Sequence, residues 1–294
     1  PVLLYRSDLF KRIELEVPKT WKEYAQAIEK LNKAFPDRLS TVANGNAAIS
    51  ADGKQAENAG EFARWSATCE PLQGQWAAQI FLARSAAYIR RYGAYSTLFD
   101  INTMEPQINR EPFVRALEEL SVVAKENQSS WNAVSPTIAQ QQILNGNCAM
   151  AIAWPTRNSS PQIQVSEKQE IEIAELPGSD EVYVFRKQIW SNRDEGAVSI
   201  PLISVSGRLA SVPRATLKSS FAFRLLTSIC GKELSVKVSP ASNHTAPLRK
   251  SQLVDVSAWL SSDYSNSADE NYAAAFERWD ESLLYLQSIR IPGR

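Results

Sequence analysis

The stretch SPTIAQQQILNGNCAMAIAWPTR, residues 135–157, predicts a helix that leads directly into a buried strand. Ser135 can cap the helix, Pro136 suits its first position, and Gly146 suits its end. The apolar run at 148–153 then predicts a strand of mostly small residues, on which another element can pack closely. A helix that feeds a buried strand is typical of an α/β fold.

The residues after this strand are the first candidates for ligand binding. Trp154 and Arg157 follow its carboxyl end, which in open α/β sheets is the edge where ligands bind. An indole ring can stack on the C–H faces of a polyhydroxylated ligand, and a guanidinium group can bond its hydroxyls or carboxylates. The structural alternative is a core tryptophan beside a surface arginine.

The composition limits the class of function. A chain of 294 residues can form two domains or one large one. Its 32 Lys and Arg balance its 32 Asp and Glu, which argues against nucleic acid and other polyanionic partners. No apolar run approaches the roughly 18 residues of a membrane span, and residues 1–10 lack the layout of a signal peptide. We therefore expect either a cytosolic protein or a targeting segment outside this sequence.

Metal, cofactor and most enzyme sites are not predicted. The single histidine, His244, and the absence of a cysteine pair at zinc spacing exclude the common zinc sites. The sequence also lacks a phosphate-binding glycine loop and a nucleophile elbow. Cys69, Cys148 and Cys230 are expected to be buried free thiols, although one disulfide of undetermined pairing remains an alternative. No cofactor is expected, and a glycosidase with scattered carboxylates remains open.

Residue periodicity predicts further elements along the chain. Thr20 and Glu23 form a capping box before an amphipathic helix, and Ser267 with Glu270 are expected to form another. The remaining expectations are a strand at 2–5, a charged turn at 6–8, a strand near 39–49, a helix from 75, an ordered loop at 98–110, a helix at 111–125, a strand at 171–176, a charged excursion at 182–196, a strand at 197–205, and helices at 214–230, 232–238 and 267–286.

Several aromatic residues lie outside the obvious core stripes. Trp65, Trp154 and Trp190 each stand next to polar or basic residues. Trp65 and Glu70 precede the helix that starts at 75 and are expected to be freer to face a cleft. Trp76 falls on the helical stripe, so it can equally be a core residue. Together these aromatics favour binding over catalysis.

Five motifs occur in a characteristic order. They are LYRSDLF at 4–10, PKTWKE at 18–23, LFD at 98–100, LNGNCAMAIAWP at 144–155 and LPG at 176–178. This order resembles the extracellular solute-binding proteins of ABC importers, family 1, which includes the maltose-binding and other sugar-binding proteins. The resemblance extends over nearly the whole chain.

The resemblance implies an α/β, periplasmic-binding-protein-like fold of class II. Two lobes joined by crossing strands close on a ligand, which is delivered to a membrane permease of the ABC importer. Residues 1–204 would then be mainly the second lobe, 205–245 a segment of the first lobe, and 246–294 a return to the second. The start of the first lobe and a helix after the turn at 291–293 are expected to lie outside this sequence. The implied location is periplasmic or extracellular, with a lipoprotein anchor as an alternative.

The resemblance also implies a set of ligand-binding positions. Trp154 to Arg157 lie where sugar binders place an aromatic residue, and Glu70-Pro71 lies where they place an acidic and aromatic loop. Leu72 departs from that pattern and leaves the sugar undetermined. The expected ligand-binding residues are Trp154, Arg157, Trp65, Glu70, Trp190 and Trp76. The leading hypothesis is a carbohydrate receptor that is not an enzyme. The alternatives are a receptor of the same fold for a peptide or carboxylate, and a carbohydrate-active enzyme.

Overall fold

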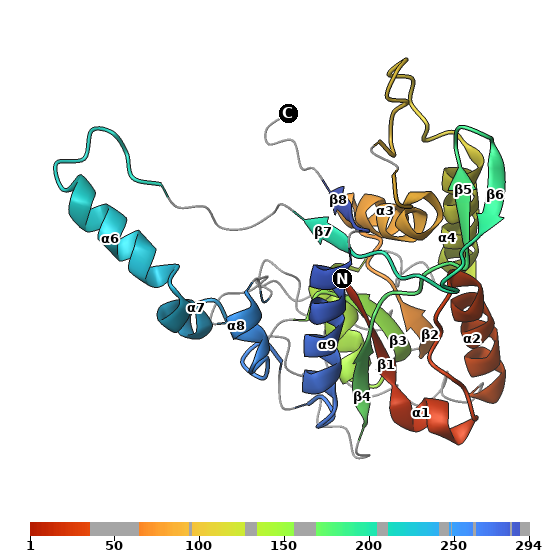
Figure 1. The fold of residues 1–294 in the computed structure, drawn as a ribbon. Coiled ribbons are helices and arrows are strands. Elements are labelled where there is room, and N and C mark those ends of the chain that lie inside the picture. Colours follow the sequence, from red (N-terminus) through yellow and green to blue (C-terminus); the bar gives the residue numbers. More distant parts are fainter. Residues whose placement is uncertain are drawn as a thin grey trace.

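A four-stranded mixed sheet lies at the centre of the fold. The computed structural model describes residues 1–35, 65–93, 96–126, 134–155, 169–204, 211–240, 247, 249–260, 263–282 and 284–288. The strand order is β2–β3–β1–β4 (Figure 1), with β1 at Val2–Arg6, β2 at Ser66–Cys69, β3 at Cys148–Ala153 and β4 at Ile171–Ala174. Only β2 and β3 run in parallel, since β1 is antiparallel to both of its neighbours. The carboxyl ends of β2 and β3 therefore lie at the same edge.

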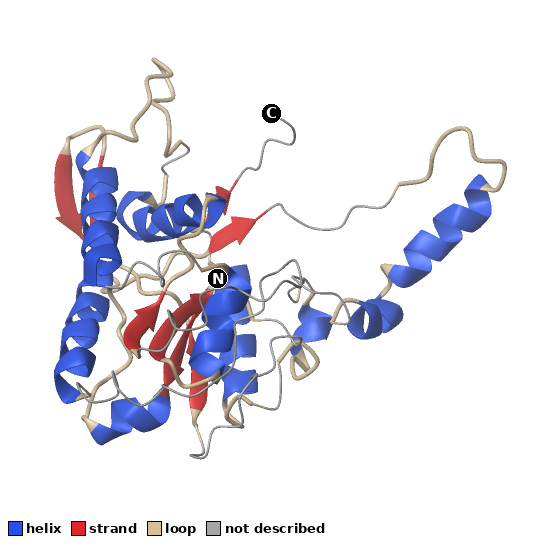
Figure 2. Cartoon of the chain, turned by 180° about the vertical axis from the view of Figure 1, so that it is seen from behind, coloured by secondary structure: helices blue, strands red, loops and turns tan. Residues whose placement is uncertain are grey.

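Helices cover both faces of this sheet (Figure 2). Side chains alternate along β1, so that Leu3 belongs to one core and Leu4 to the other. The helices that contribute to the Leu3 core are α1 (Ser7–Arg12), α2 (Trp21–Ala34), α3 (Gln75–Ile89) and α4 (Glu111–Glu126). Those of the Leu4 core are α5 (Pro136–Leu144) and α9 (Ala268–Glu281). Cover on both faces explains why every residue of β3 is apolar and buried.

The local signals for helix ends are confirmed at two helices. The Thr20 hydroxyl accepts a hydrogen bond from the Glu23 backbone N–H at 3.1 Å, and the Glu23 carboxylate accepts one from the Thr20 N–H at 3.2 Å. Ser135 accepts from the N–H of Ile138 at 3.4 Å at the start of α5. Gly146 follows α5 with φ +80°, a conformation that favours glycine. The short-range chemistry therefore placed α2, α5 and the start of β3 correctly.

Two segments expected to be irregular form regular elements. The charged residues at 6–8 end β1 and begin α1, and the Arg6 guanidinium donates two hydrogen bonds to the Asp8 carboxylate at 2.7 and 2.6 Å. The excursion at 182–196 contains a hairpin of β5 (Glu181–Val184) and β6 (Ile189–Asn192). Its charged residues suggested a loop, but its aromatic side chains pack on α3 and α4 and hold the two strands together.

The expected capping box at the start of α9 is wrong. The Ser267 hydroxyl makes no capping hydrogen bond and instead donates to the Glu172 carboxylate on β4. Ser265 donates to the same carboxylate, and so does the Asn271 amide at 3.0 Å. Ser267 has helical backbone angles (φ −85°, ψ −11°) and not the extended ones typical of a capping serine, and its charge-assisted bond to Glu172 holds the hydroxyl toward β4.

Two further short strands pair with each other outside the four-stranded sheet, and a helical segment of the chain separates them in the sequence. β7 (Leu202–Ser204) and β8 (Leu286–Ser288) pair in parallel beside α3 (Figure 1). Between them in the sequence lie α6 (Ser219–Ile229), α7 (Lys232–Val238), α8 (Lys250–Leu253) and α9, of which α9 packs on the Leu4 core of the sheet. In both views α6 extends far from the sheet, and none of its residues is buried. The strand expected at 197–205 is thus shorter, and the one near 39–49 lies outside the described residues. Of the helices that the structure describes, none is long and apolar enough to cross a membrane.

Candidate functional site

Trp76 and Trp154 meet at the sheet edge where β2 and β3 end. Trp154 is the first residue after β3, and Trp76 lies in the first turn of α3. Their ring centroids are 5.4 Å apart, and the ring planes are inclined at 55°. Both rings are half-buried, and Trp154 packs on the Leu3 core. Two inclined indole rings that remain partly exposed can stack on the apolar faces of a ligand.

The loop between β2 and α3 determines where Trp76 lies. Gly74 precedes the helix with φ +53°, a backbone conformation that residues with a side chain rarely adopt. The Gln73 N–H donates to the Val134 carbonyl at 3.2 Å, and the Trp76 N–H donates to the Gln73 carbonyl at 3.0 Å. The first turn of α3 contains no acidic residue, so the positive end of the helix dipole beside Trp76 is not neutralised by a side chain of that turn.

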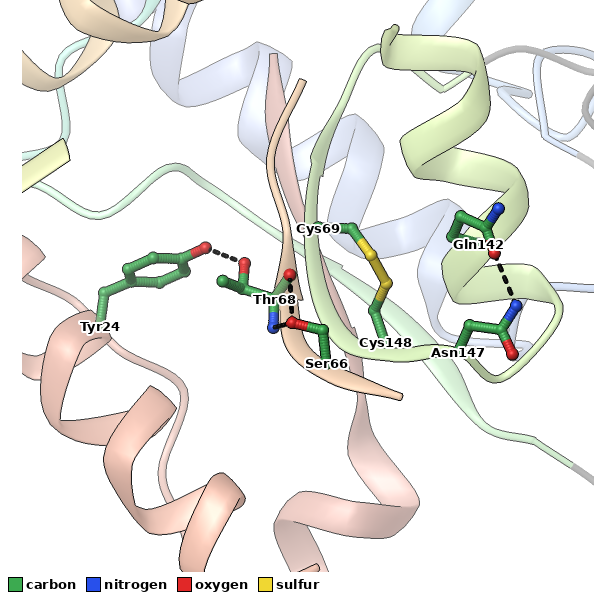
Figure 3. The surroundings of a disulfide bond; sticks show 7 residues. All are labelled: Tyr24, Ser66, Thr68, Cys69, Gln142, Asn147 and Cys148. Carbon is green, nitrogen blue, oxygen red and sulfur yellow. Dashed lines mark hydrogen bonds between the residues drawn. A yellow bond between two sulfur atoms is a disulfide. The ribbon is translucent and has the colours of Figure 1, made fainter. Parts of the chain in front are cut away.

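Glu70 lies in the core and does not face a cleft. Its side chain is 0% exposed and pairs with the guanidinium group of Arg84, which is 1% exposed. Arg84 lies 4.2 Å from the centre of the Trp21 ring. Beside this pair, the Tyr24 hydroxyl is hydrogen-bonded to the Thr68 hydroxyl of β2 (Figure 3). Burial, and then the nearby Glu70 carboxylate, raise the pKa of Tyr24 well above its usual 10.0, so Tyr24 acts only as a neutral hydroxyl.

Trp65 and Trp190 do not join the pair formed by Trp76 and Trp154. Trp65 is 4% exposed and packs edge-on against Phe35, with ring centroids 6.0 Å apart. Trp190 packs edge-on against Tyr88 near the other end of α3, at 5.8 Å. Because Tyr88 follows Trp76 by 12 positions, the two contacts are separated by about 18 Å along the helix.

The expected orientations at this edge are therefore reversed. Trp65 and Glu70 were expected to face a cleft, whereas both are buried, and Trp76, the candidate for a core residue, is partly exposed. Glu70 is buried because it pairs with Arg84, and Trp65 is buried because it packs on Phe35, two contacts that no local pattern in the sequence reveals. Direct contact of Trp65, Glu70 and Trp190 with a ligand stays a prediction. Arg157 lies outside the described residues, as does His244.

The surroundings of Trp190 form a closed structural cluster. The Arg115 guanidinium lies between the rings of Tyr88 and Trp190, at 4.6 and 4.9 Å from their centres. It also binds the Glu119 carboxylate at 3.3 Å and the Glu181 carboxylate at 2.9 Å. Burial, and then the charge of Glu119, raise the pKa of Tyr88 above its ordinary range. These contacts hold the hairpin on α3 and α4 and explain the position of Trp190 without a ligand.

Cys69 and Cys148 form a disulfide that joins β2 to β3 (Figure 3). Their Cα atoms are 6.0 Å apart, and both side chains are fully buried. The expectation of three buried free thiols is wrong, whereas the alternative of one disulfide is confirmed, with Cys230 free and exposed. Parallel pairing of two strands that are far apart in the sequence brings the two sulfur atoms together, which the spacing alone could not reveal. The bond also links the strands that lead to Glu70 and Trp154.

The partly exposed groups described at this edge are suited to stacking. Within the described ranges, no group of three or more His, Cys, Asp or Glu residues could hold a metal ion. The two indole rings offer apolar faces, and the amino-terminal end of the α3 dipole offers positive potential for electronegative oxygens. This combination can bind a ligand that has both C–H faces and oxygen acceptors.

Comparisons with known proteins identify the fold. No protein-family model matches the sequence, and no curated protein matches it. Solved structures do match. An ABC solute-binding protein from Agrobacterium radiobacter K84 in complex with ribitol has 15% identity and a TM-score of 0.58 over 96% of this chain and 57% of its own. MalE from Xanthomonas citri, a sugar-binding protein, has 16% identity and a TM-score of 0.54 over 98% of this chain and 57% of its own.

A third match binds a different kind of solute. UgpB from Mycobacterium tuberculosis, in complex with glycerophosphocholine, has 14% identity and a TM-score of 0.52 over 98% of this chain and 57% of its own. The chain thus has the α/β fold of two-lobed, periplasmic-binding-protein-like structures. It spans less than two thirds of the length of the structures that it matches.

Proposed function

We propose that this protein is a solute-binding receptor of an ABC importer and that its ligand is a carbohydrate or polyol. The observation that carries the proposal is the contact of Trp76 with Trp154, two half-buried rings at the carboxyl end of β3. The fold supports it, because the neighbours named above are solute-binding proteins and not enzymes. In this role the rings stack on the sugar, and Arg157 bonds its hydroxyls.

We also propose the division of the chain into lobes that the resemblance implies. Residues 1–204 form mainly the second lobe, 205–245 belong to the first, and 246–294 return to the second. Two features support this division. The chain packs on the Leu4 core again from Val256 onward, and before that return α6 lies far from the sheet with no buried residue. On closure, the first lobe would cover the ligand, which the permease would then receive.

The proposed location is periplasmic or extracellular. The disulfide between Cys69 and Cys148 supports it, because structural disulfides form and persist in oxidising compartments. Mass spectrometry after thiol alkylation without reduction tests this proposal on protein from its native source. Labelling at Cys230 alone is expected, and labelling at Cys69 or Cys148 would contradict it.

Thermal unfolding against a panel of solutes tests the function. A ligand that binds only the native state raises the unfolding midpoint by mass action, so a sugar or polyol is expected to raise it. Trp76→Ala and Trp154→Ala should each weaken binding about tenfold or more, because stacking residues at the centre of a site contribute most of its affinity. Trp279→Ala, which removes another half-buried ring on α9, is the matched control and should leave binding unchanged.

A receptor for an anionic solute is the second candidate. The acid-free first turn of α3 beside Trp76 favours it, and the glycerophosphocholine in complex with UgpB contains a negatively charged phosphodiester beside its quaternary ammonium group. The panel therefore includes phosphorylated polyols, carboxylates and short peptides. A shift seen only with anions, and weakened by salt, would support this candidate over neutral sugars. Turnover of a chromogenic glycoside would instead support an enzyme.

A further inference from the structure

We propose that the buried pair of Glu70 and Arg84 is a positioning device that keeps Trp76 in contact with Trp154. Glu70 would then affect ligand binding through Trp76 and not by touching the ligand. The consequence for binding rests on the proposed function, whereas the positioning itself can be measured without any ligand.

The first step is the place of Glu70 in the chain. It is the first residue after β2, and only four residues separate it from the start of α3 at Gln75. Arg84 lies in the second half of that same helix, on its buried side. The ion pair therefore ties the end of β2 to the body of the helix that the loop leads into. It thereby fixes the orientation of α3 relative to β2.

The second step is the anchoring of Arg84. Its guanidinium lies 4.2 Å from the centre of the Trp21 ring and 5.5 Å from that of Tyr24, both on α2. The Tyr24 hydroxyl is in turn hydrogen-bonded to Thr68 on β2. Arg84 thus lies where α2, β2 and α3 meet. A buried guanidinium is costly without its carboxylate, so loss of Glu70 should displace Arg84 and the helix that carries it.

The third step links this junction to Trp76. Trp76 precedes Arg84 by eight residues, about 12 Å along the helix, so a tilt of α3 about Arg84 moves the Trp76 ring relative to β3. Trp154 does not move with α3, because it follows β3, which is paired on both sides and joined to β2 by the disulfide. The distance between the two rings therefore reports the orientation of α3.

The test uses far-ultraviolet circular dichroism. Two indole rings in contact produce an exciton couplet, a pair of bands of opposite sign, and its amplitude is measured. The 294-residue chain is compared with Glu70→Ala, Glu70→Gln and Trp76→Phe, well below each unfolding midpoint. Trp76→Phe should abolish the couplet and thereby assign it to this pair. Glu70→Ala should reduce the couplet at least twofold. Glu70→Gln should keep most of it, because the amide retains the length and one acceptor oxygen for Arg84.

A control separates positioning from general loss of stability. Leu31→Ala removes a fully buried side chain of α2 and should lower the midpoint comparably while leaving the couplet intact. An unchanged couplet in folded Glu70→Ala, or an equal loss in Leu31→Ala, would overturn the proposal. Should Glu70→Ala fail to fold, Glu70→Asp is used, since its shorter carboxylate should pull on the loop and lower the couplet.

The binding readout keeps the two proposals distinguishable. If no solute on the panel shifts the midpoint of the unsubstituted chain, the proposed function fails while the couplet still tests the positioning. If a solute does bind, its dissociation constant should rise at least fivefold in Glu70→Ala and less than twofold in Glu70→Gln. A normal affinity together with a lost couplet would contradict the link from Trp76 to binding.

Discussion

The ion pair between Arg6 and Asp8 shows how burial determines the contribution of a single residue to stability. Arg6 is 2% exposed at the end of β1, and Asp8 is its bidentate acceptor. Burial by itself would raise the pKa of Asp8, but the hydrogen bonds and the charge of Arg6 outweigh it and lower the pKa below its usual 3.8. The pair therefore favours the ionised carboxylate in the folded state.

Asp8→Asn is expected to lower the free energy of unfolding by about 1–3 kcal/mol at pH 7, because it leaves a buried guanidinium with a weaker acceptor. Since the pKa of Asp8 is lower in the folded than in the unfolded state, this stabilisation is present above about pH 4 and is lost as the pH falls through the folded pKa. Urea unfolding at pH 7 and pH 3 measures it. A difference between the two proteins that does not depend on pH would contradict this account.

Lys11→Gln is the matched control for that experiment. Lys11 pairs with Glu170 at 2.7 Å, but both side chains are exposed. Solvent screens such a pair, so its loss should change stability little at either pH. Both variants remove one charge from an ion pair made by α1, so the difference between them measures the effect of burial on the strength of the pair.

At the scale of elements, α3 is terminated by a residue from the hairpin region. One terminal nitrogen of Arg193, just after β6, donates to the carbonyls of Ala87 and Arg90 at 2.8 and 2.7 Å. These bonds satisfy acceptors at the carboxyl end of the helix, where a positive charge is favourable. Burial lowers the pKa of Arg193, although a guanidinium remains charged at neutral pH. The helix and the hairpin thus stabilise each other.

Arg193→Ala should lower the free energy of unfolding by about 1–3 kcal/mol, the range for hydrogen bonds made by charged groups. Chemical denaturation measures this change. Hydrogen exchange should also show faster opening in the last turn of α3. Arg186→Ala, at an exposed position in the hairpin turn, is the control and should have little effect. Equal effects of the two variants would count against capping by Arg193.

The disulfide acts on two elements at once, since it joins β2 to β3 across 79 residues. Chain-entropy estimates for a loop of this size are about 4–5 kcal/mol, and measured effects range from about 0 to 5 kcal/mol. The double variant Cys69→Ala/Cys148→Ala should therefore have a free energy of unfolding lower by about 2–5 kcal/mol and a clearly lower unfolding midpoint. Cys230→Ala is the control and should be neutral. A reducing agent should lower the midpoint of the unsubstituted chain but not that of the double variant.

At the scale of the whole molecule, α6 is a described helix that buries none of its residues. Phe221, Phe223 and Leu225 are all more than half exposed, and the helix lies far from the sheet in both views. An amphipathic helix normally buries its apolar face, and large exposed apolar patches mark interaction surfaces. This feature agrees with the proposal that 205–245 belong to the other lobe.

The isolated 294-residue chain should consequently self-associate as its concentration rises. Phe221→Ser/Leu225→Ser should shift it toward the monomer, because the substitutions remove the apolar surface of α6 that drives association. Light scattering coupled to size exclusion measures the mass. Arg224→Gln, a polar exposed position on the same helix, is the control. A monomer at all concentrations, or no effect of the double substitution, would refute a role for this face.

The sequence by itself determined the elements whose signals are local. These elements are α2, α5 and β3. The helices were predicted from the caps at Thr20 and Ser135 and the turn at Gly146, since capping and glycine signals act within a few residues. The strand was predicted from its own apolar run at 148–153. The order of motifs also predicted the α/β fold that the structural matches share. Trp154 was recognised as a candidate because it directly follows a buried strand.

Only the tertiary structure decided which of these residues come together. The pairing of β2 with β3 creates the disulfide, and the position of α3 brings Trp76 to Trp154 and Arg84 to Glu70. The hairpin of β5 and β6 likewise depends on aromatic contacts with α3. Each of these contacts joins residues of separate elements, and it depends on how those elements pack. A local pattern contains no information about that packing. The sequence therefore indicated candidate residues but not which of them are buried in the core and which are partly exposed at the site.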